Sequence, residues 1–161
     1  MKKKLYTAFL LFIAVCIFCS DAEANNRCLE KQLDKKHKQD TIKVEFENQF
    51  TLYWDCVNHK IIRDDNYYGI LENKENVRAI GFFITDKKKV CNFVCSKKKS
   101  LKKGDVAYLF LSENGFVYEA KDLGEQFDVL YSDCRYPYGL LDYIEKNRNI
   151  VFKKVMSCIN R

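Results

Sequence analysis

Two histidines, His37 and His59, are the only imidazoles that the sequence offers for acid–base chemistry. His37 lies among lysines and is interpreted as a solvated residue. His59 follows Asp55 by four positions, so a carboxylate and an imidazole fall near the end of an expected strand. Asp-x3-His is not a recognised catalytic spacing, because catalytic partners usually meet from distant segments. His59 and Asp55 are therefore weak catalytic candidates, and we interpret His59 as a turn residue.

Carboxylate pairs and phosphate-binding loops give no stronger indication of an enzyme. The adjacent acids Asp64 and Asp65 are typical of a turn. The sequence has no P-loop, no Gly-x-Gly-x-x-Gly, no Gly-x-Ser-x-Gly and no His-Glu-x-x-His motif. We therefore predict no cofactor and lean against an enzyme. The alternative is a small secreted hydrolase of nucleic acid or cell-wall polymer, using His59 with Asp55 or Asp64.

The first 24 residues predict a secretory signal peptide. Three lysines after Met1 precede an apolar run of 15 residues, and Ala22 and Ala24 occupy the small positions read by a signal peptidase. The run is shorter than the roughly 20 residues that a membrane-spanning helix needs. A retained anchor is the competing interpretation. Cleavage after Ala24 would leave residues 25–161 as one domain with a charge of +5, in the periplasm or outside the cell.

Six of the eight cysteines follow the predicted signal peptide, and an even number in an oxidising compartment predicts three disulfides. Cys91 and Cys95 fall in a β-prone run, where their sulfurs would leave one face about 13 Å apart at roughly 3.3 Å per residue. That separation prevents a bond between them. We expect Cys56 and Cys134 to be their partners and Cys28 to pair with Cys158. A metal site at Cys91 and Cys95 is the rival, but no second ligand pair supports it, so none is predicted.

A lysine-rich stretch around Cys91 and Cys95 is the strongest surface signal. Eight lysines fall within 17 acid-free residues: Lys87, Lys88, Lys89, Lys97, Lys98, Lys99, Lys102 and Lys103. Such a patch attracts anionic polymers or acidic proteins without reading sequence. Lysines also solvate turns and protect exposed sheet edges, which is the alternative interpretation.

A second surface signal is the Cys134-Arg135-Tyr136-Pro137-Tyr138-Gly139 segment. Arginine and tyrosine on a disulfide-held loop are the composition of a protein-binding hot spot, with Arg135, Tyr136 and Tyr138 as its contact residues. Tyrosine is also an ordinary half-buried residue of small domains. Both interpretations remain open at the level of sequence.

The elements that must position these residues predict an α+β fold. Apolar residues on even positions of 41–56, broken at 47–49, predict two antiparallel strands and a turn. Further β-prone runs at 67–71, 77–85 and 90–95 extend this to a meander of about five strands. We expect a helix at 27–38, a helix or buried strand at 106–111, a possible strand at 127–131, and helices at about 140–147 and from 149. Disulfides are expected to staple the fold.

Without a catalytic signature, the sequence favours an exported binding protein, of the kind that inhibits or neutralises a lytic enzyme or toxin. The expected partner is a protein or an anionic envelope polymer, and no membrane span is expected after signal cleavage. Passive electrostatic binding to envelope polymers through Lys87–Lys103 is a further alternative.

Overall fold

The computed structural model describes residues 40–47, 49–92, 94, 97, 99–127 and 134–160. The chain divides into two units, Met1–Gln39 and Asp40–Arg161, and the description that follows concerns the second. The predicted signal peptide, the expected helix at 27–38, and residues Cys28, Cys95 and Lys98 all lie outside the described residues.

The predicted hairpin is confirmed. Strands β1 (Thr41–Phe46) and β2 (Phe50–Asp55) pair antiparallel with Val44 opposite Leu52 and Phe46 opposite Phe50. Their even-numbered residues point into the core, where Phe46, Leu52 and Trp54 are fully buried. Strand β3 (Lys60–Ile62) pairs with β2 on its other side and completes a three-stranded sheet. The alternation of apolar and polar residues therefore predicted correctly both the strands and the face that points into the core.

The expectation of a five-stranded meander is wrong, because two of its runs are helices. Helix α2 (Asp65–Leu71) begins after Asp64, whose carboxylate accepts the Tyr67 N–H at 2.9 Å. Helix α3 (Lys74–Phe82) begins after Asn73, which caps it in the same way, and a short 3-10 turn η1 (Phe83–Thr85) follows. Capping residues and burial at helical spacing, not β-propensity, decide these segments. Their buried residues are Tyr67, Ile70, Val77, Ile80, Gly81 and Ile84.

The third β-prone run forms a much shorter strand than expected. Strand β4 (Lys89–Cys91) pairs antiparallel with β5 (Leu101–Lys102) in a separate two-stranded sheet. Beyond Cys91 the described backbone makes an isolated bridge between Val94 and Lys97. Strand β4 thus ends at Cys91, and Cys95 lies outside the described residues, so the premise that both cysteines share one strand stays a prediction.

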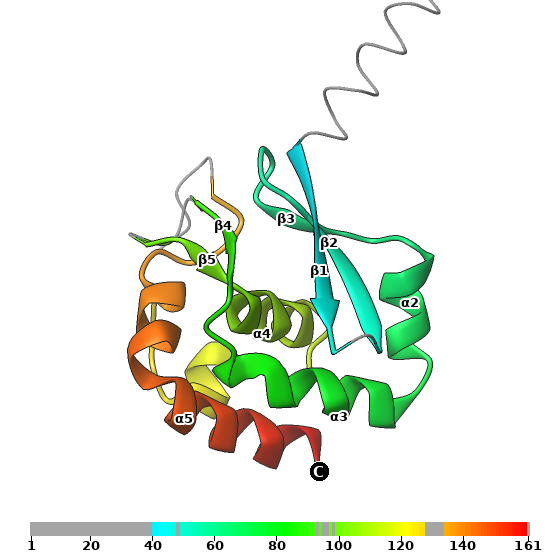
Figure 1. Cartoon of the computed structure of the whole chain (residues 1–161). Coiled ribbons are helices and arrows are strands. Elements are labelled where there is room, and N and C mark those ends of the chain that lie inside the picture. Colours follow the sequence, from blue (N-terminus) through cyan, green and yellow to red (C-terminus); the bar gives the residue numbers. More distant parts are fainter. Residues whose placement is uncertain are drawn as a thin grey trace, which may run out of the picture. The chain divides into compact units, whose positions relative to one another are not determined.

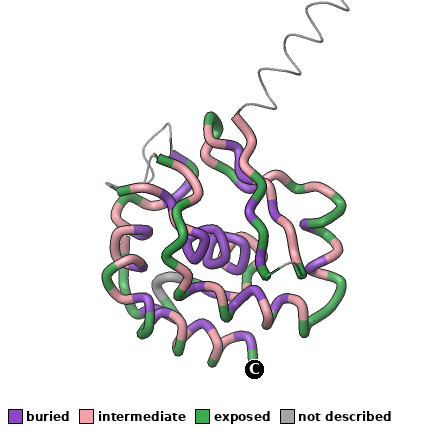
Figure 2. Tube along the Cα trace, viewed as in Figure 1, coloured by how far each residue is buried: buried purple, intermediate pink, exposed green. Residues whose placement is uncertain are grey.

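Helix α4 (Lys103–Glu113) lies at the centre of the fold (Figures 1 and 2). All residues from Lys103 to Leu111 are buried, so the helix is enclosed on every side. This explains why its apolar run was ambiguous between a helix and a buried strand: an enclosed helix has no polar face to reveal its period. Gly115 follows the helix with φ of 74°, in the left-handed conformation that glycine favours just past a helix end.

The C-terminal helices are confirmed, but they are joined. Helix α5 (Leu140–Ile159) is continuous except at Asn147, whose φ of −119° and ψ of 25° mark a kink near the predicted break. Leu140, Leu141 and Ile144 are buried before the kink, and Val151 and Val155 after it. Figure 1 shows α5 running beside α3 beneath α4. A π-helical turn, η2 (Glu119–Leu123), precedes α5, and the possible strand at 127–131 lies almost wholly outside the described residues.

Within the described residues, no two cysteines lie at disulfide-bonding distance. Cys56, Cys91 and Cys158 are not disulfide-bonded. Cys134 is disulfide-bonded. The fold is therefore α+β, with one three-stranded and one two-stranded antiparallel sheet packed with helices.

Candidate functional site

The lysine-rich stretch divides into exposed and buried residues. Lys87, Lys88, Lys89 and Lys99 are exposed, and Lys102 is half-buried with its ammonium 2.9 Å from the Ser100 hydroxyl. Two residues assigned to the patch from sequence face inward instead: Lys97 is 4% exposed and Lys103 is 8% exposed. The surface that these lysines offer is thus smaller than their number in the sequence suggests.

Lys97 belongs to a buried ion-pair network on α4 and α5. Its ammonium lies 2.5 Å from Asp105 Oδ2 and also contacts the Glu145 carboxylate. Arg148 approaches the same Asp105 from α5, with its guanidinium 2.6 Å from Oδ1 and 2.8 Å from the Ile84 carbonyl. Buried charges require such pairing because desolvation is costly. We interpret the network as structural, since its two cations donate to its own buried carboxylates and to the Ile84 carbonyl.

Lys103 is held by a different contact set. Its ammonium lies 3.3 Å from Asp86 Oδ2 and sits over the rings of Phe46 and Phe83, at 5.1 and 4.8 Å from their centroids. An ammonium over two aromatic faces is stabilised by the ring quadrupoles. Lys103 therefore fastens the start of α4 to β1 and η1.

Asp55 forms and closes the turn between β2 and β3. Its carboxylate accepts the Val57 and Asn58 N–H groups at 3.0 and 2.8 Å and the Asn58 side-chain amide at 2.7 Å. Burial acts to raise the pKa of Asp55, but these hydrogen bonds and the charge of Lys60 outweigh it and hold the pKa below its ordinary value. The carboxylate is thus an ionised turn former.

His59 ends the same turn with φ of 49°, in the left-handed region that non-glycine residues rarely adopt. Burial lowers its pKa, and the nearby Asp55 only partly opposes that effect. The imidazole is therefore neutral at pH 7. Asp64, the other acid of the hydrolase hypothesis, is engaged as the cap of α2. The structure thus gives both acids of that hypothesis a structural role.

The Arg/Tyr segment contains one buried and two exposed contact candidates. Tyr136 is 5% exposed, stacks on Trp54 with ring centroids 6.3 Å apart, and donates its hydroxyl to Glu113 Oε1 at 2.7 Å. Burial, reinforced by the Glu113 carboxylate, raises the pKa of Tyr136 far above its ordinary value. Tyr138 is 42% exposed, and the Arg135 side chain is 46% exposed. Tyr136 thus anchors the segment, and its neighbours face outward.

These elements meet at a cleft that we call the cationic cleft, with a volume of about 400 Å³. It is lined by Asp55, Lys60, Ile61, Ile62, Arg63 and Arg135. The lining brings together two residues singled out from sequence, Asp55 and Arg135, although 80 positions separate them. Three cations and one turn-bound carboxylate give the lining a positive balance.

Glu113 lies between the two arginines of the cationic cleft and contacts both of them. Its side chain is only 8% exposed, and its carboxylate lies 3.5 Å from Arg63 and 3.7 Å from Arg135. Arg63 also lies 5.7 Å from the centroid of the Tyr67 ring. Both contacts to Glu113 are long, so most of the five N–H donors of each guanidinium remain for another acceptor. The arrangement holds two arginines half-exposed and ready for an anion.

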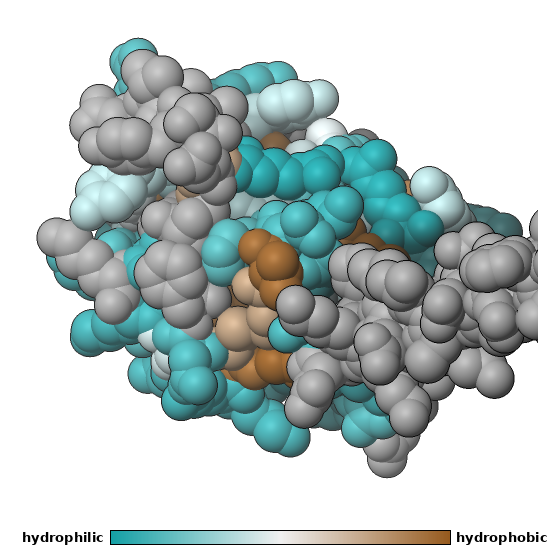
Figure 3. All heavy atoms as spheres, turned by 90° about the horizontal axis from the view of Figure 1, so that it is seen from above, coloured by the Kyte–Doolittle hydropathy of each residue, from teal (hydrophilic) through white to brown (hydrophobic). Residues whose placement is uncertain are grey.

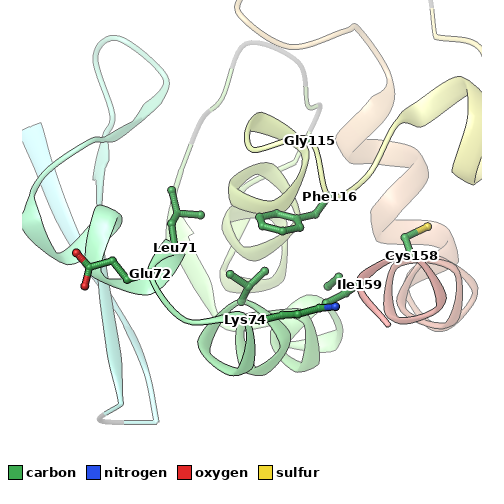
Figure 4. Close-up of a pocket in the computed structure, with 8 residues that line it drawn as sticks. Leu71, Glu72, Lys74, Gly115, Phe116, Cys158 and Ile159 are labelled. Carbon is green, nitrogen blue, oxygen red and sulfur yellow. The ribbon is translucent and has the colours of Figure 1, made fainter. Parts of the chain in front are cut away.

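A second pocket of about 490 Å³ lies between the α2–α3 junction, the end of α4 and the end of α5 (Figure 4). Leu71, Val77, Phe116 and Ile159 give it an apolar wall, and Glu72, Lys74, Gly115 and Cys158 complete the lining. Among the residues singled out from sequence, it contains Cys158 alone. It lacks the convergent polar groups that orient a ligand.

No known protein family, curated protein or solved structure matches this chain. Across the described residues, no group of three histidine, cysteine or acidic side chains is placed to hold a metal ion. None of the described helices combines the length and apolar character needed to cross a bilayer.

Sequence reasoning missed Lys60, Arg63 and Glu113. Arg63 carried no motif, and Glu113 ends an apolar helix where an acid is unremarkable. A one-dimensional signal for the cationic cleft does not exist, because its lining comes from the end of β2, from β3 and the residue after it, and from the 134–138 segment, while Glu113 comes from the end of α4. Only folding places them together.

Proposed function

We propose that this chain is an exported, disulfide-stapled binding protein that inhibits or neutralises a lytic enzyme or toxin, and that the cationic cleft contacts an acidic segment of that partner. The observation that carries the proposal is the pair of half-exposed arginines, Arg63 and Arg135, held beside Lys60. A guanidinium binds a carboxylate through two parallel hydrogen bonds, so the cleft suits aspartate or glutamate side chains.

The surroundings of Arg135 support a protein partner. Tyr136 fixes the segment from inside through Trp54 and Glu113, so Arg135 and Tyr138 are presented by an anchored backbone. Preorganised arginine and tyrosine side chains lose little entropy on binding, which is the usual chemistry of interface hot spots. Tyr136 supports the surface without forming it.

The compartment remains part of the proposal. A charged start, a short apolar run and Ala22 and Ala24 support export and cleavage, which would leave Asn25 as the first residue. N-terminal sequencing of protein from the envelope or medium tests this step. A mature chain that still begins at Met1 would refute it.

The binding test uses the exported protein as bait against envelope and culture extracts. We expect it to capture a protein whose lytic or toxic activity falls when the bait is added in equimolar amount. Arg63→Ala with Arg135→Ala should lower that affinity by at least tenfold, because each lost bidentate contact is worth about 1.5–3 kcal/mol.

The matched control is Lys87→Ala with Lys88→Ala, which removes the same charge from the exposed lysines. Equal loss of affinity in both double variants would refute the assignment to the cationic cleft. Capture of no protein whose activity the bait suppresses would refute the proposed function itself.

The exposed lysines favour a second candidate, electrostatic binding to an anionic envelope polymer. Lys87, Lys88, Lys89 and Lys99 form a solvent-facing group near β4 and β5. Binding of this kind weakens steeply with salt, because it depends on counterion release. Sedimentation with purified anionic polymer at low and high salt tests it, and salt-independent binding would exclude it.

A further inference from the structure

Two thiols that are distant in the chain meet in the fold. Cys56 lies in the turn after β2, and Cys91 is the last residue of β4. Their side chains are in hydrogen-bonding contact, and neither is disulfide-bonded. Both are half-buried and pack against the hydrophobic core. The fold therefore brings two cysteines together from separate elements.

The contact joins two segments of the chain that belong to no common β-sheet and share no strand pairing. Cys56 directly follows β2 of the β1-β2-β3 sheet, and Cys91 ends β4 of the β4-β5 sheet. Figure 1 shows the β2–β3 turn and the end of β4 on the same side of the fold. Figure 3 views that side and shows apolar residues gathered between hydrophilic ones. Tertiary packing alone thus places the two sulfurs together.

We propose that Cys56 and Cys91 form a disulfide that fastens the β2–β3 turn to β4. The oxidant is a small-molecule or protein disulfide. One protein thiolate attacks that disulfide, which forms a mixed disulfide and releases the first thiol. The second protein thiolate then displaces the second thiol and closes the S–S bond. The two cysteines lose two electrons, the oxidant gains them, and the two thiol protons end on the released thiols.

The positions of the two side chains favour this pair. They are already neighbours, so the sulfurs need only approach to the bonded distance of about 2.05 Å. Burial, followed by the Cys91 contact, raises the pKa of the Cys56 thiol to about 12. Because the thiolate is the reactive form, this slows the reaction of Cys56 with the oxidant and with iodoacetamide alike, so alkylation is carried out in denaturant.

The proposed bond would also hold one wall of the cationic cleft. Asp55 precedes Cys56, and Lys60 ends the same turn, and both line the cleft. Oxidation would restrict the motion of this turn. After reduction, the hydrogen bonds from Val57 and Asn58 to Asp55 would still hold it, but the covalent link to β4 would be lost. The inference deepens the disulfide-stapled part of the proposed function but does not rest on the proposed partner, because the bond can be tested without one.

The test is peptide mapping of the full chain after exposure to glutathione disulfide, with iodoacetamide to block remaining thiols. Trypsin leaves Cys91 and Cys95 in one peptide, Val90–Lys97, so chymotrypsin is added to cut after Phe93. We expect the principal product of Cys56 to be a peptide linked to Cys91. Recovery of Cys56 as an alkylated thiol, or linked to Cys95, would overturn the proposal.

Variants provide a second arm. Cys56→Ser and Cys91→Ser should each make the other cysteine alkylatable, whereas Cys158→Ser should leave the Cys56–Cys91 link intact. Hydrogen exchange of the wild-type chain tests the effect on the turn. The Val57 and Asn58 amides should exchange several-fold faster after reduction, and unchanged exchange would refute the role in holding the cleft. The mapping decides the pairing even where a variant fails to fold.

Discussion

Replacing Asp105 with alanine is expected to be one of the most destabilising single changes in the chain. Asp105 is fully buried and accepts from three donors: the Lys97 ammonium at 2.5 Å, the Arg148 guanidinium at 2.6 Å and the Lys102 N–H at 2.8 Å. The alanine variant leaves two buried cations with Glu145 as their remaining carboxylate among the described contacts. It also leaves the first turn of α4 without its side-chain acceptor.

The expected loss is about 3–5 kcal/mol, the usual cost of removing one member of a buried ion pair. Domains of this size typically have a free energy of unfolding of about 5–15 kcal/mol, so the change removes a large share of it. With a urea m-value of about 2 kcal/mol/M, the unfolding midpoint should fall by about 2 M. The m-value itself should stay constant, because the surface exposed on unfolding is unchanged.

The assay is urea unfolding followed by fluorescence of Trp54, which is fully buried. Asp86→Ala is the matched control: its carboxylate is 28% exposed, contacts Lys103 at 3.3 Å, and should cost about 1 kcal/mol. A double-mutant cycle with Lys97→Met should give a coupling energy of at least about 1 kcal/mol. Additive losses, or an Asp105→Ala loss no larger than that of Asp86→Ala, would refute the network as described.

Gly104→Ala should destabilise the fold by about 2–3 kcal/mol or more in thermal unfolding, because the added Cβ would lie 2.2 Å from the Ile84 carbonyl oxygen. Gly69→Ala is the control: its Cβ would meet no heavy atom within 4 Å, so it should stabilise the fold by about 0.5–1 kcal/mol. Glu47→Gly should raise the melting temperature because Glu47 has φ of 48°, while Gln49→Gly in the same turn should lower it; equal shifts would contradict this argument. Burial acts to raise the pKa of Glu145, but Lys97, Arg148 and Lys102 outweigh it and lower the pKa below its ordinary 4.5. Glu145 therefore contributes stability that is present above pH 4.5 and lost as the pH falls through its lower folded value, and Glu145→Gln should flatten stability–pH curves in that acidic range.

Several features were predictable because they depend on local pattern. Alternation in 41–56 fixed the hairpin and its buried face. The two helical patterns on either side of Asn147 gave the C-terminal helices, since periodic burial is visible in one dimension. Cys56 was expected to form a disulfide with Cys91 or Cys95; it interacts with Cys91, but the two are not bonded in this structure.

The secondary structure of other segments was predicted wrongly, because aromatic and β-branched residues suit both strands and buried helices. The residues of α2 and α3 have β-propensity, but Asp64 and Asn73 cap them as helices, and packing against the core selects that state. The last strand of the expected meander shortened to β4 for a related reason: pairing with the two-residue β5 limits its length.

By itself, the sequence determined the hairpin, the C-terminal helices and the supply of cysteines, and it predicts an export signal, because each is a local or compositional property. Tertiary structure alone decided that Lys97 and Lys103 are buried while Lys87 is exposed, and that Tyr136 anchors a segment whose Arg135 faces outward. It also assembled the cationic cleft from the β2–β3 region and the distant 134–138 segment. Burial and proximity depend on what the rest of the chain places around a residue, and a list of residue types does not contain that information.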